Sequence, residues 1–379
     1  MRPLLAVPLL ALLAACSDAV PLRPITPAPT PTRTPPFLSP GVPDEPAPPT
    51  PATPLSGCPD VVVEGRGYII DLAFLGDRLV LGTSTGLLLQ APSGGFTTLD
   101  PDPAWRVRVL ADGAIYAETS TAALWDSFSL VRFDLEGVRT VLLDPDDLRD
   151  LAALHAPPSS DGSVAHAVVA DFALLGDRLV FSADDLALVD HLAVGLAGGN
   201  AGHLFSLPAD GSGTATTHAA FAVAGELSVD AARGEIYLAG VTIDRHDLLG
   251  SSATIFDNFD VSPQRLTATE NVLFVTSGAN GAVVAVDKQS YAVRAFDMSA
   301  AHWDVDVAVA GDYLYWLERD FLPDFTVGRV RRAPLAGGEP ELVSDCVSSP
   351  SRMMAHDGAL WIASESDAGG VLSRLPLPE

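Results

Sequence analysis

The chain has 379 residues, of which 48% are hydrophobic and 18% charged, and its formal net charge is −26. This apolar content excludes disorder along the whole chain. The excess of acidic residues argues against nucleic acid as a partner, since nucleic-acid-binding proteins present basic surfaces. The 32 glycines and 31 prolines indicate many turns.

A short apolar segment opens the chain. The run from Leu4 to Leu13 leads directly into Ala14, Ala15 and Cys16. It is too short to cross a bilayer as a mature helix. Small residues directly before a cysteine resemble the signal of bacterial lipoproteins. An ordinary secretory signal that is cut nearby is the alternative.

The lipoprotein resemblance implies that residues 1–15 are removed. It also implies that Cys16 carries a thioether-linked diacylglycerol and an N-acyl chain, which bind this end of the protein to a membrane. We expect no other cofactor, since the sequence has no nucleotide-binding motif. Ser17, rather than an acid, follows the cysteine. By the same resemblance, this favours the outer membrane of a bacterial cell envelope.

A proline-rich segment follows the anchor. Fourteen prolines fall between Pro21 and Pro54, mixed with Thr, Ala and Ser. Proline fixes φ and removes a backbone donor, so neither helix nor sheet is expected. We interpret residues 16–57 as the lipidated cysteine and a semi-rigid tether, and residues 58–379 as the folded domain.

The remaining chain is repetitive. The segment DLAFLGDRLV at 71–80 recurs as DFALLGDRLV at 171–180. A polar turn that enters a short apolar or aromatic strand occurs seven times, starting at residues 76, 112, 176, 233, 270, 311 and 357. Further alternating strands follow each turn. Four-stranded units at this period predict an all-β fold, a seven-bladed β-propeller. Six blades, with residues 225–260 as an irregular insertion, is the alternative.

Residues 311–338, GDYLYWLERD followed by GRVRRAPLAGG, resemble the YWTD-type and related propeller repeats, and residues 71–95 do so in part. The resemblance implies the propeller fold and no particular activity, because this fold carries many functions.

The ends of the domain are expected to meet. The last repeat stops soon after its third strand, so we expect Asp60 to Val63 to supply its missing outer strand and close the ring. Cys58 precedes this strand and Cys346 leads into the last repeat. In an oxidising compartment the two can form a disulfide that staples the closure.

Catalytic motifs are weak. Gly82 to Gly86 match G-x-S-x-G, but they join two expected strands and therefore indicate a hairpin turn. Acid-rich stretches at 100–102 and 144–150 lack the spacing of a calcium loop.

Four candidate residues for a metal site in the channel fall near the innermost strands: Asp71, Asp171, Asp304 and His356. Such a site would need these side chains to converge. Asp304 and Asp306 are expected on one strand face, by the period of two.

Long insertions at 144–168 and 184–203 are the expected binding surface, and Leu148 to His155 can form one or two helical turns. The leading hypothesis is a non-enzymatic binding or scaffold lipoprotein with an envelope protein or glycan as partner. Its rigid acidic surface mildly favours cationic partners. A metal-dependent lactonase-like or lyase-like propeller is the second hypothesis, and a purely structural envelope component is the third.

Overall fold

The computed structural model describes residues 55, 57–120, 128–154, 165–189, 192–195, 202–221, 225–240, 242–256, 263–277, 281–298, 302–320, 327–366 and 369–378. The expected signal peptide, Cys16 and nearly all of the tether lie outside these residues. Among the described residues, no helix has the length and apolar character that a membrane crossing requires.

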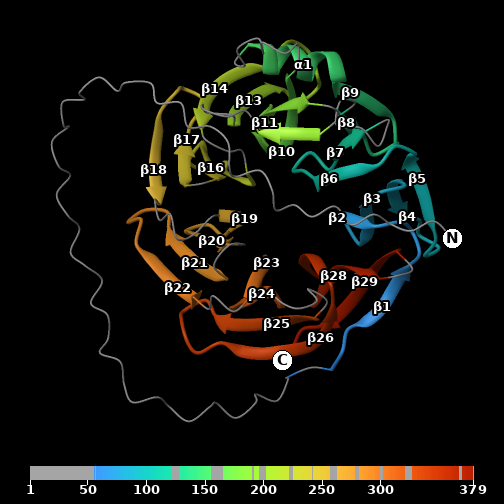
Figure 1. Cartoon of the computed structure of the whole chain (residues 1–379), viewed down its shortest axis with the longest axis vertical. Coiled ribbons are helices and arrows are strands. Elements are labelled where there is room, and N and C mark those ends of the chain that lie inside the picture. The colour runs from blue at the N-terminus through green and yellow to red at the C-terminus, as the bar shows by residue number, and fades with distance from the viewer. Residues whose placement is uncertain are drawn as a thin grey trace, which may run out of the picture. The chain divides into compact units, whose positions relative to one another are not determined.

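Seven small antiparallel sheets are arranged in a ring, which confirms the seven-bladed β-propeller (Figure 1). Blade 1 consists of β2 (Ile69–Leu75), β3 (Arg78–Thr83), β4 (Gly86–Gln90) and β5 (Phe96–Asp100). Blade 2 consists of β6 (Ala104–Val109), β7 (Ile115–Ser120), β8 (Phe128–Phe133) and β9 (Arg139–Leu143). Blade 3 consists of β10 (Ala165–Leu175), β11 (Arg178–Val189), β13 (Gly202–Pro208) and β14 (Thr216–Phe221), with β12 (Leu192–Gly195) paired to β11.

The remaining blades follow the same pattern. Blade 4 consists of β15 (Leu227–Asp230), β16 (Glu235–Ala239), β17 (Ile243–His246) and β18 (Ser252–Phe256). Blade 5 consists of β19 (Pro263–Ala268), β20 (Val272–Ser277), β21 (Ala282–Asp287) and β22 (Val293–Met298). Blade 6 consists of β23 (His302–Ala310), β24 (Tyr313–Asp320), β25 (Val327–Pro334) and β26 (Glu341–Ser348). Blade 7 consists of β27 (Pro350–His356), β28 (Ala359–Ser366), β29 (Gly369–Pro376) and β1 (Asp60–Glu64).

All seven turn motifs lie between the first and second strands of their blades. The six-bladed alternative is wrong, because residues 225–260 contain the regular four-stranded sheet of blade 4. Its weak repeat signal has a local cause: β15 and β17 have only four residues each. The Gly82–Gly86 motif is a hairpin between β3 and β4, as expected.

The core lies between neighbouring blades. Val80 of blade 1 packs with Val107 and Val131 of blade 2. Between blades 7 and 1, Leu372 packs with Leu79 in the same way. Each blade therefore buries both faces of its sheet against its neighbours, and burial of apolar surface holds the ring together.

A single helix is present among the described residues, α1 (Pro145–Ala153). It begins earlier than the sequence analysis expected, because Asp144 caps it: the Asp144 side chain accepts from the backbone N–H groups of Asp146 and Asp147, and Asp147 reciprocates. This capping box explains the acidic stretch at 144–147. Leu148 and Leu151 then pack into the cluster between blades 2 and 3.

The expected closure of the ring is confirmed. β1 lies beside β29 (Figure 1) and pairs with it antiparallel. Asp60 is opposite Arg374 in this pairing. The Cys58–Cys346 disulfide joins the entry of β1 to β26 of blade 6. Residues expected in the tether also contact β26: Leu55 donates its N–H to the Leu342 carbonyl at 3.0 Å, and Ser344 Oγ donates to the Gly57 carbonyl at 3.2 Å.

This geometry predicts that the disulfide stabilises the closure. Replacing Cys58 and Cys346 by Ser should lower the free energy of unfolding by about 2–5 kcal/mol, since the bond restrains a long loop in the unfolded chain. Urea unfolding with and without reductant measures the effect, and reductant should not change the double variant. Equal unfolding midpoints of the wild type with and without reductant would contradict the prediction.

Candidate functional site

Each blade has a charged residue close to the ring axis, at an equivalent position in its first strand or directly before it. In six blades the pairing of the first and second strands shifts register immediately before this residue, which marks a β-bulge. These six residues are Asp71, Arg106, Asp171, Arg265, Asp306 and Arg352. In blade 4 the equivalent residue is Glu226, directly before β15.

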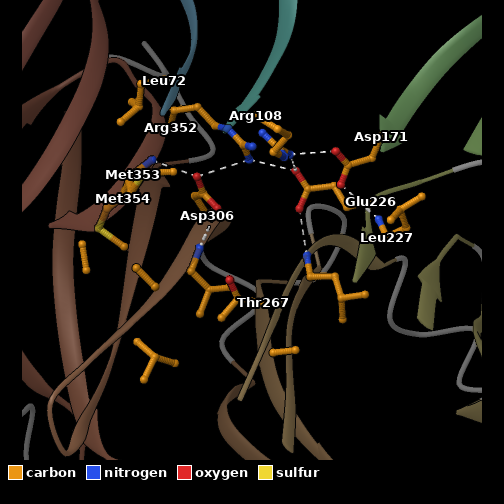
Figure 2. A pocket seen from close by; sticks show the side chains of 16 residues that line it. Leu72, Arg108, Asp171, Glu226, Leu227, Thr267, Asp306, Arg352, Met353 and Met354 are labelled. Carbon is orange, nitrogen blue, oxygen red and sulfur yellow. Dashed lines mark hydrogen bonds and ion pairs between the residues drawn. The ribbon is translucent and has the colours of Figure 1, made fainter. Parts of the chain in front are cut away.

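With Arg108, these seven residues form what we call the central charge network. It contains four carboxylates and four guanidiniums, so its formal charge is zero although the whole chain carries −26. Arg352 Nε donates to Asp71 at 2.8 Å, and Arg352 Nη1 lies 2.9 Å from Glu226 and 3.4 Å from Asp306. Figure 2 shows Arg352 between Asp306 and Glu226, and Arg108 between Glu226 and Asp171.

Glu226 is the hub of the network. Its Oε1 atom lies 2.6 Å from Arg265, 2.9 Å from Arg352, 3.2 Å from Arg106 and 3.7 Å from Arg108. Burial by itself would raise the pKa of Glu226, but these four guanidiniums hold the pKa well below its ordinary value. Glu226 is therefore ionised at any physiological pH.

The carboxylates also connect the blades through the backbone. Each accepts a hydrogen bond from the N–H that follows the network residue of the next blade. The four pairs are Asp71 with Val107 at 3.0 Å, Asp171 with Leu227 at 3.1 Å, Glu226 with Leu266 at 2.9 Å, and Asp306 with Met353 at 2.8 Å. Charge-assisted bonds of this kind are stronger than neutral ones. Three of them, to Val107, Leu266 and Met353, satisfy backbone groups where a bulge interrupts the strand pairing.

The network separates two pockets. We call the first the turn-side pocket, because most of its lining residues lie between the network positions and the turns that end the first strands. It has a volume of about 340 Å³ and is lined by residues such as Leu72, Leu227 and Met353 (Figure 2). The entry-side pocket, of about 300 Å³, is lined by Ile70, Trp105, Arg106, Glu118, Phe128, Val168, Val169, Ala170 and Arg265. Most of these residues precede the network positions in their strands, so the two pockets open on opposite sides of the network.

The structure brings together two of the four candidate channel residues. Asp71 and Asp171 both bind Arg108, at 2.8 and 2.9 Å. His356 instead ends β27 and stacks on Phe74, with ring centroids 3.7 Å apart. No group of three or more His, Cys, Asp or Glu side chains that could hold a metal ion occurs among the described residues.

Asp304 and Asp306 were expected on one face of their strand because side chains alternate with a period of two. The structure does not have this regular alternation between them. The pairing with β24 shifts register between these two residues, and a bulge interrupts the alternation of side chains. Asp306 belongs to the network, whereas only the backbone of Asp304 is among the described residues. The acid-rich stretch at 100–102 also has a structural role, since Asp100 accepts from Asp102 N–H and from Arg139.

Sequence reasoning missed Arg106, Arg108, Glu226, Arg265 and Arg352. A signal for part of the network was present. In five repeats a charged residue stands five positions before the turn motif: Asp71, Asp171, Arg265, Asp306 and Arg352. A search of the repeats for charge at a fixed offset would have found these five together.

No family model matches this chain. No curated protein matches its sequence. Several solved structures are similar in fold. A chain of a mitotic checkpoint complex aligns with a TM-score of 0.58 at 11% identity, over 88% of this chain and 99% of that chain. A GH74 enzyme from Niastella koreensis aligns with a TM-score of 0.52 at 11% identity, over 75% of this chain and 46% of that chain. A chain of a nidogen/laminin complex aligns with a TM-score of 0.44 at 10% identity, over 66% and 84%. At such identities, the first two show likeness of fold alone.

Glu226 should dominate the stability of the network. Replacing Glu226 by Gln leaves four guanidiniums without their shared carboxylate, and the loss of one partner of a buried ion pair costs about 3–5 kcal/mol. Glu341→Gln, which removes the half-exposed partner of Arg332, is the matched control and should cost about 0–1 kcal/mol. Equal shifts of the two variants in urea unfolding would show that Glu226 is not the hub.

Glu118 should give the protein a pH dependence of its own. Burial raises the pKa of Glu118 from 4.5 to about 8, although Arg106 and the N–H of Val169 lower it. Between these values the folded chain holds a proton that the unfolded chain has lost, so the free energy of unfolding falls as pH rises. Glu118→Gln should remove this slope, which urea unfolding at several pH values measures. An unchanged slope would contradict the assignment.

Proposed function

We propose that this chain is a lipid-anchored binding protein of the bacterial cell envelope. In this proposal Cys16 carries the diacylglycerol and N-acyl chains and holds the protein on the outer membrane. The proline-rich tether keeps the propeller away from the bilayer. The propeller itself binds an envelope protein or glycan and catalyses no reaction.

The observation that carries the proposal is that the carboxylates near the ring axis are bound to arginines and to backbone N–H groups. Asp71, Asp171, Glu226 and Asp306 each bind at least one guanidinium and one backbone N–H of the next blade. A general acid or base, or a metal ligand, must be able to reach a substrate or an ion. Asp71 and Asp171, two of the four residues on which the lactonase-like or lyase-like alternative depended, are thus engaged in contacts between blades.

The disulfide agrees with the proposed compartment. Disulfides form and persist in oxidising environments and are rare in the reducing cytosol. The Cys58–Cys346 bond therefore supports export of the chain, which the segment before Cys16 also predicts. The bond lies where the tether meets β26, so it strengthens the point at which an anchored chain is pulled.

Blade 3 supplies the best candidate for a partner surface. Its β10 and β11 have 11 and 12 residues, and β11 continues beyond the four-stranded sheet to pair with β12. This projection belongs to the long insertion at 184–203 that the sequence analysis singled out. Residues 190, 191 and 196–201 of that insertion lie outside the described part of the chain.

One experiment tests both parts of the proposal. The wild type, Cys16→Ala and a deletion of residues 186–200 are expressed in bacterial cells, crosslinked, and recovered from envelope fractions for mass spectrometry. We expect the wild type in the outer membrane with a stoichiometric partner. The Cys16→Ala variant should leave the membrane fraction, and the deletion variant should stay there without the partner.

The deletion is designed to preserve blade 3. Asp184 pairs with Gly202, so joining residue 185 to residue 201 closes β11 and β13 with a tight turn. Retention of Cys16→Ala in the membrane would refute the anchor. Undiminished capture by the deletion variant would refute the role of the insertion, and the absence of any partner of the wild type would refute the scaffold function.

A further inference from the structure

The entry-side pocket has both arginine side chains and apolar side chains in its walls. Arg106 and Arg265 come from blades 2 and 5, and both line this pocket. Both also bind the same atom, Glu226 Oε1, at 3.2 and 2.6 Å. The two guanidiniums therefore lie close to each other in the wall of the pocket.

Arg106 and Arg265 form fewer ion pairs than the other two arginines of the network. Arg108 is paired with Asp71 and Asp171, and Arg352 with Asp71 and Asp306. Among the described residues, Glu226 is the only carboxylate that forms an ion pair with Arg106 or Arg265, and it also binds the other two arginines. Each guanidinium has five N–H donors in a planar fork. Arg106 and Arg265 thus have donor capacity left for an anion.

The pKa shifts of Arg106 and Glu118 agree with a pocket that can bind an anion. Burial lowers the pKa of Arg106, against the attraction of Asp171 and Glu226, and the nearby charges of Arg108 and Arg265 lower it further. A bound anion would relieve that cost. Burial also raises the pKa of Glu118 to about 8, so at neutral pH this carboxyl is protonated and adds no negative charge to the pocket.

Glu118 supplies a neutral polar wall. Its Oε1 atom accepts the N–H of Val169 at 3.0 Å, and the side chain is only 3% exposed. A protonated carboxyl has one O–H to donate. In its protonated form Glu118 can therefore help to bind an anion, whereas in its ionised form it would repel one.

The remaining walls are apolar. Trp105 and Phe128 meet edge to face with centroids 6.3 Å apart, and Ile70 and Val168 complete the surface. A volume of about 300 Å³ is at the small end of ligand pockets. We propose that this pocket binds a small organic acid, with its carboxylate on Arg106 and Arg265 and its apolar body against Trp105 and Phe128.

A singly charged carboxylate fits better than a phosphate group. Guanidinium groups bind carboxylates through paired, nearly parallel hydrogen bonds. Because the central charge network is formally neutral, every bound negative charge leaves an excess in a buried site, and a dianion leaves twice as much. This inference goes beyond the proposed function, since it needs neither the lipid anchor nor a macromolecular partner.

Binding to the full chain, purified in detergent, tests the proposal. The probes are benzoate, 3-phenylpropionate and hexanoate, each compared with its primary amide by titration calorimetry, and phenyl phosphate as the dianion. We expect at least one acid to bind, and to bind more tightly than its amide and than phenyl phosphate. Binding of none of the acids, equal affinity for the amides, or tighter binding of phenyl phosphate would overturn the proposal.

Variants place the site. Arg106→Gln and Arg265→Gln should each weaken binding of the acid by roughly 10–100-fold, the usual effect of losing a charge-assisted hydrogen bond. Arg294→Gln, which changes an exposed arginine on β22, is the matched control and should bind as the wild type does. Thermal unfolding checks that each variant is folded.

A variant outside the central charge network tests the pocket without removing an ion pair on which folding depends. Trp105 is 37% exposed and forms no part of the network, so Trp105→Ala should fold, bind aromatic acids more weakly and still prefer acid over amide. Undiminished binding in Trp105→Ala, or in both folded arginine variants, would show that the acid binds elsewhere and overturn the assignment.

The pH dependence provides an independent readout. Affinity for the acid should fall by up to about tenfold per unit as pH rises above about 8, because Glu118 then loses its proton. Glu118→Gln should bind the acid at pH 7 and lose this dependence. A fall of the same size in Glu118→Gln would overturn the role of Glu118.

Discussion

The structure depends on the ionic centre of the ring. One oxygen of Glu226 faces four guanidiniums that come from blades 2, 5 and 7, and three further carboxylates complete the set. Each carboxylate also accepts a backbone N–H from the next blade. The central charge network connects blades that are not neighbours as well as those that are, because Glu226 of blade 4 binds arginines of blades 2, 5 and 7.

The bulges make this arrangement possible. A register shift in the first strand interrupts regular pairing, turns one side chain toward the axis and leaves a neighbouring backbone N–H in need of an acceptor. A carboxylate from the preceding blade supplies the acceptor where one is present. In the blades that follow Arg265 and Arg352, the acids Asp306 and Asp71 instead bind the N–H of their own following residue, Val307 and Leu72.

The central charge network has equal numbers of carboxylates and guanidiniums, but the carboxylates are unevenly shared among the four arginines. Three carboxylates accompany Arg108 and Arg352, whereas Arg106 and Arg265 share Glu226 with both of these arginines. One side of the channel is therefore suited to an anion in a chain that is otherwise strongly acidic. Arg106 and Arg265, which bind the channel carboxylate Glu226, also line the entry-side pocket.

The amino-acid sequence by itself determined the local features. The seven turn motifs, the closing strand that starts at Asp60 and the Cys58–Cys346 pair could all be predicted, because turns and alternating strands depend on neighbouring residues and the ends of a ring must meet. Tertiary structure decided the centre. Arg352 reaches Asp71 across 281 positions, the bulge at Asp306 breaks the alternation on which the Asp304 expectation relied, and His356 stacks on Phe74 instead of reaching the axis. Only closure of the ring brings these charges within bonding distance, so their partners depend on long-range packing.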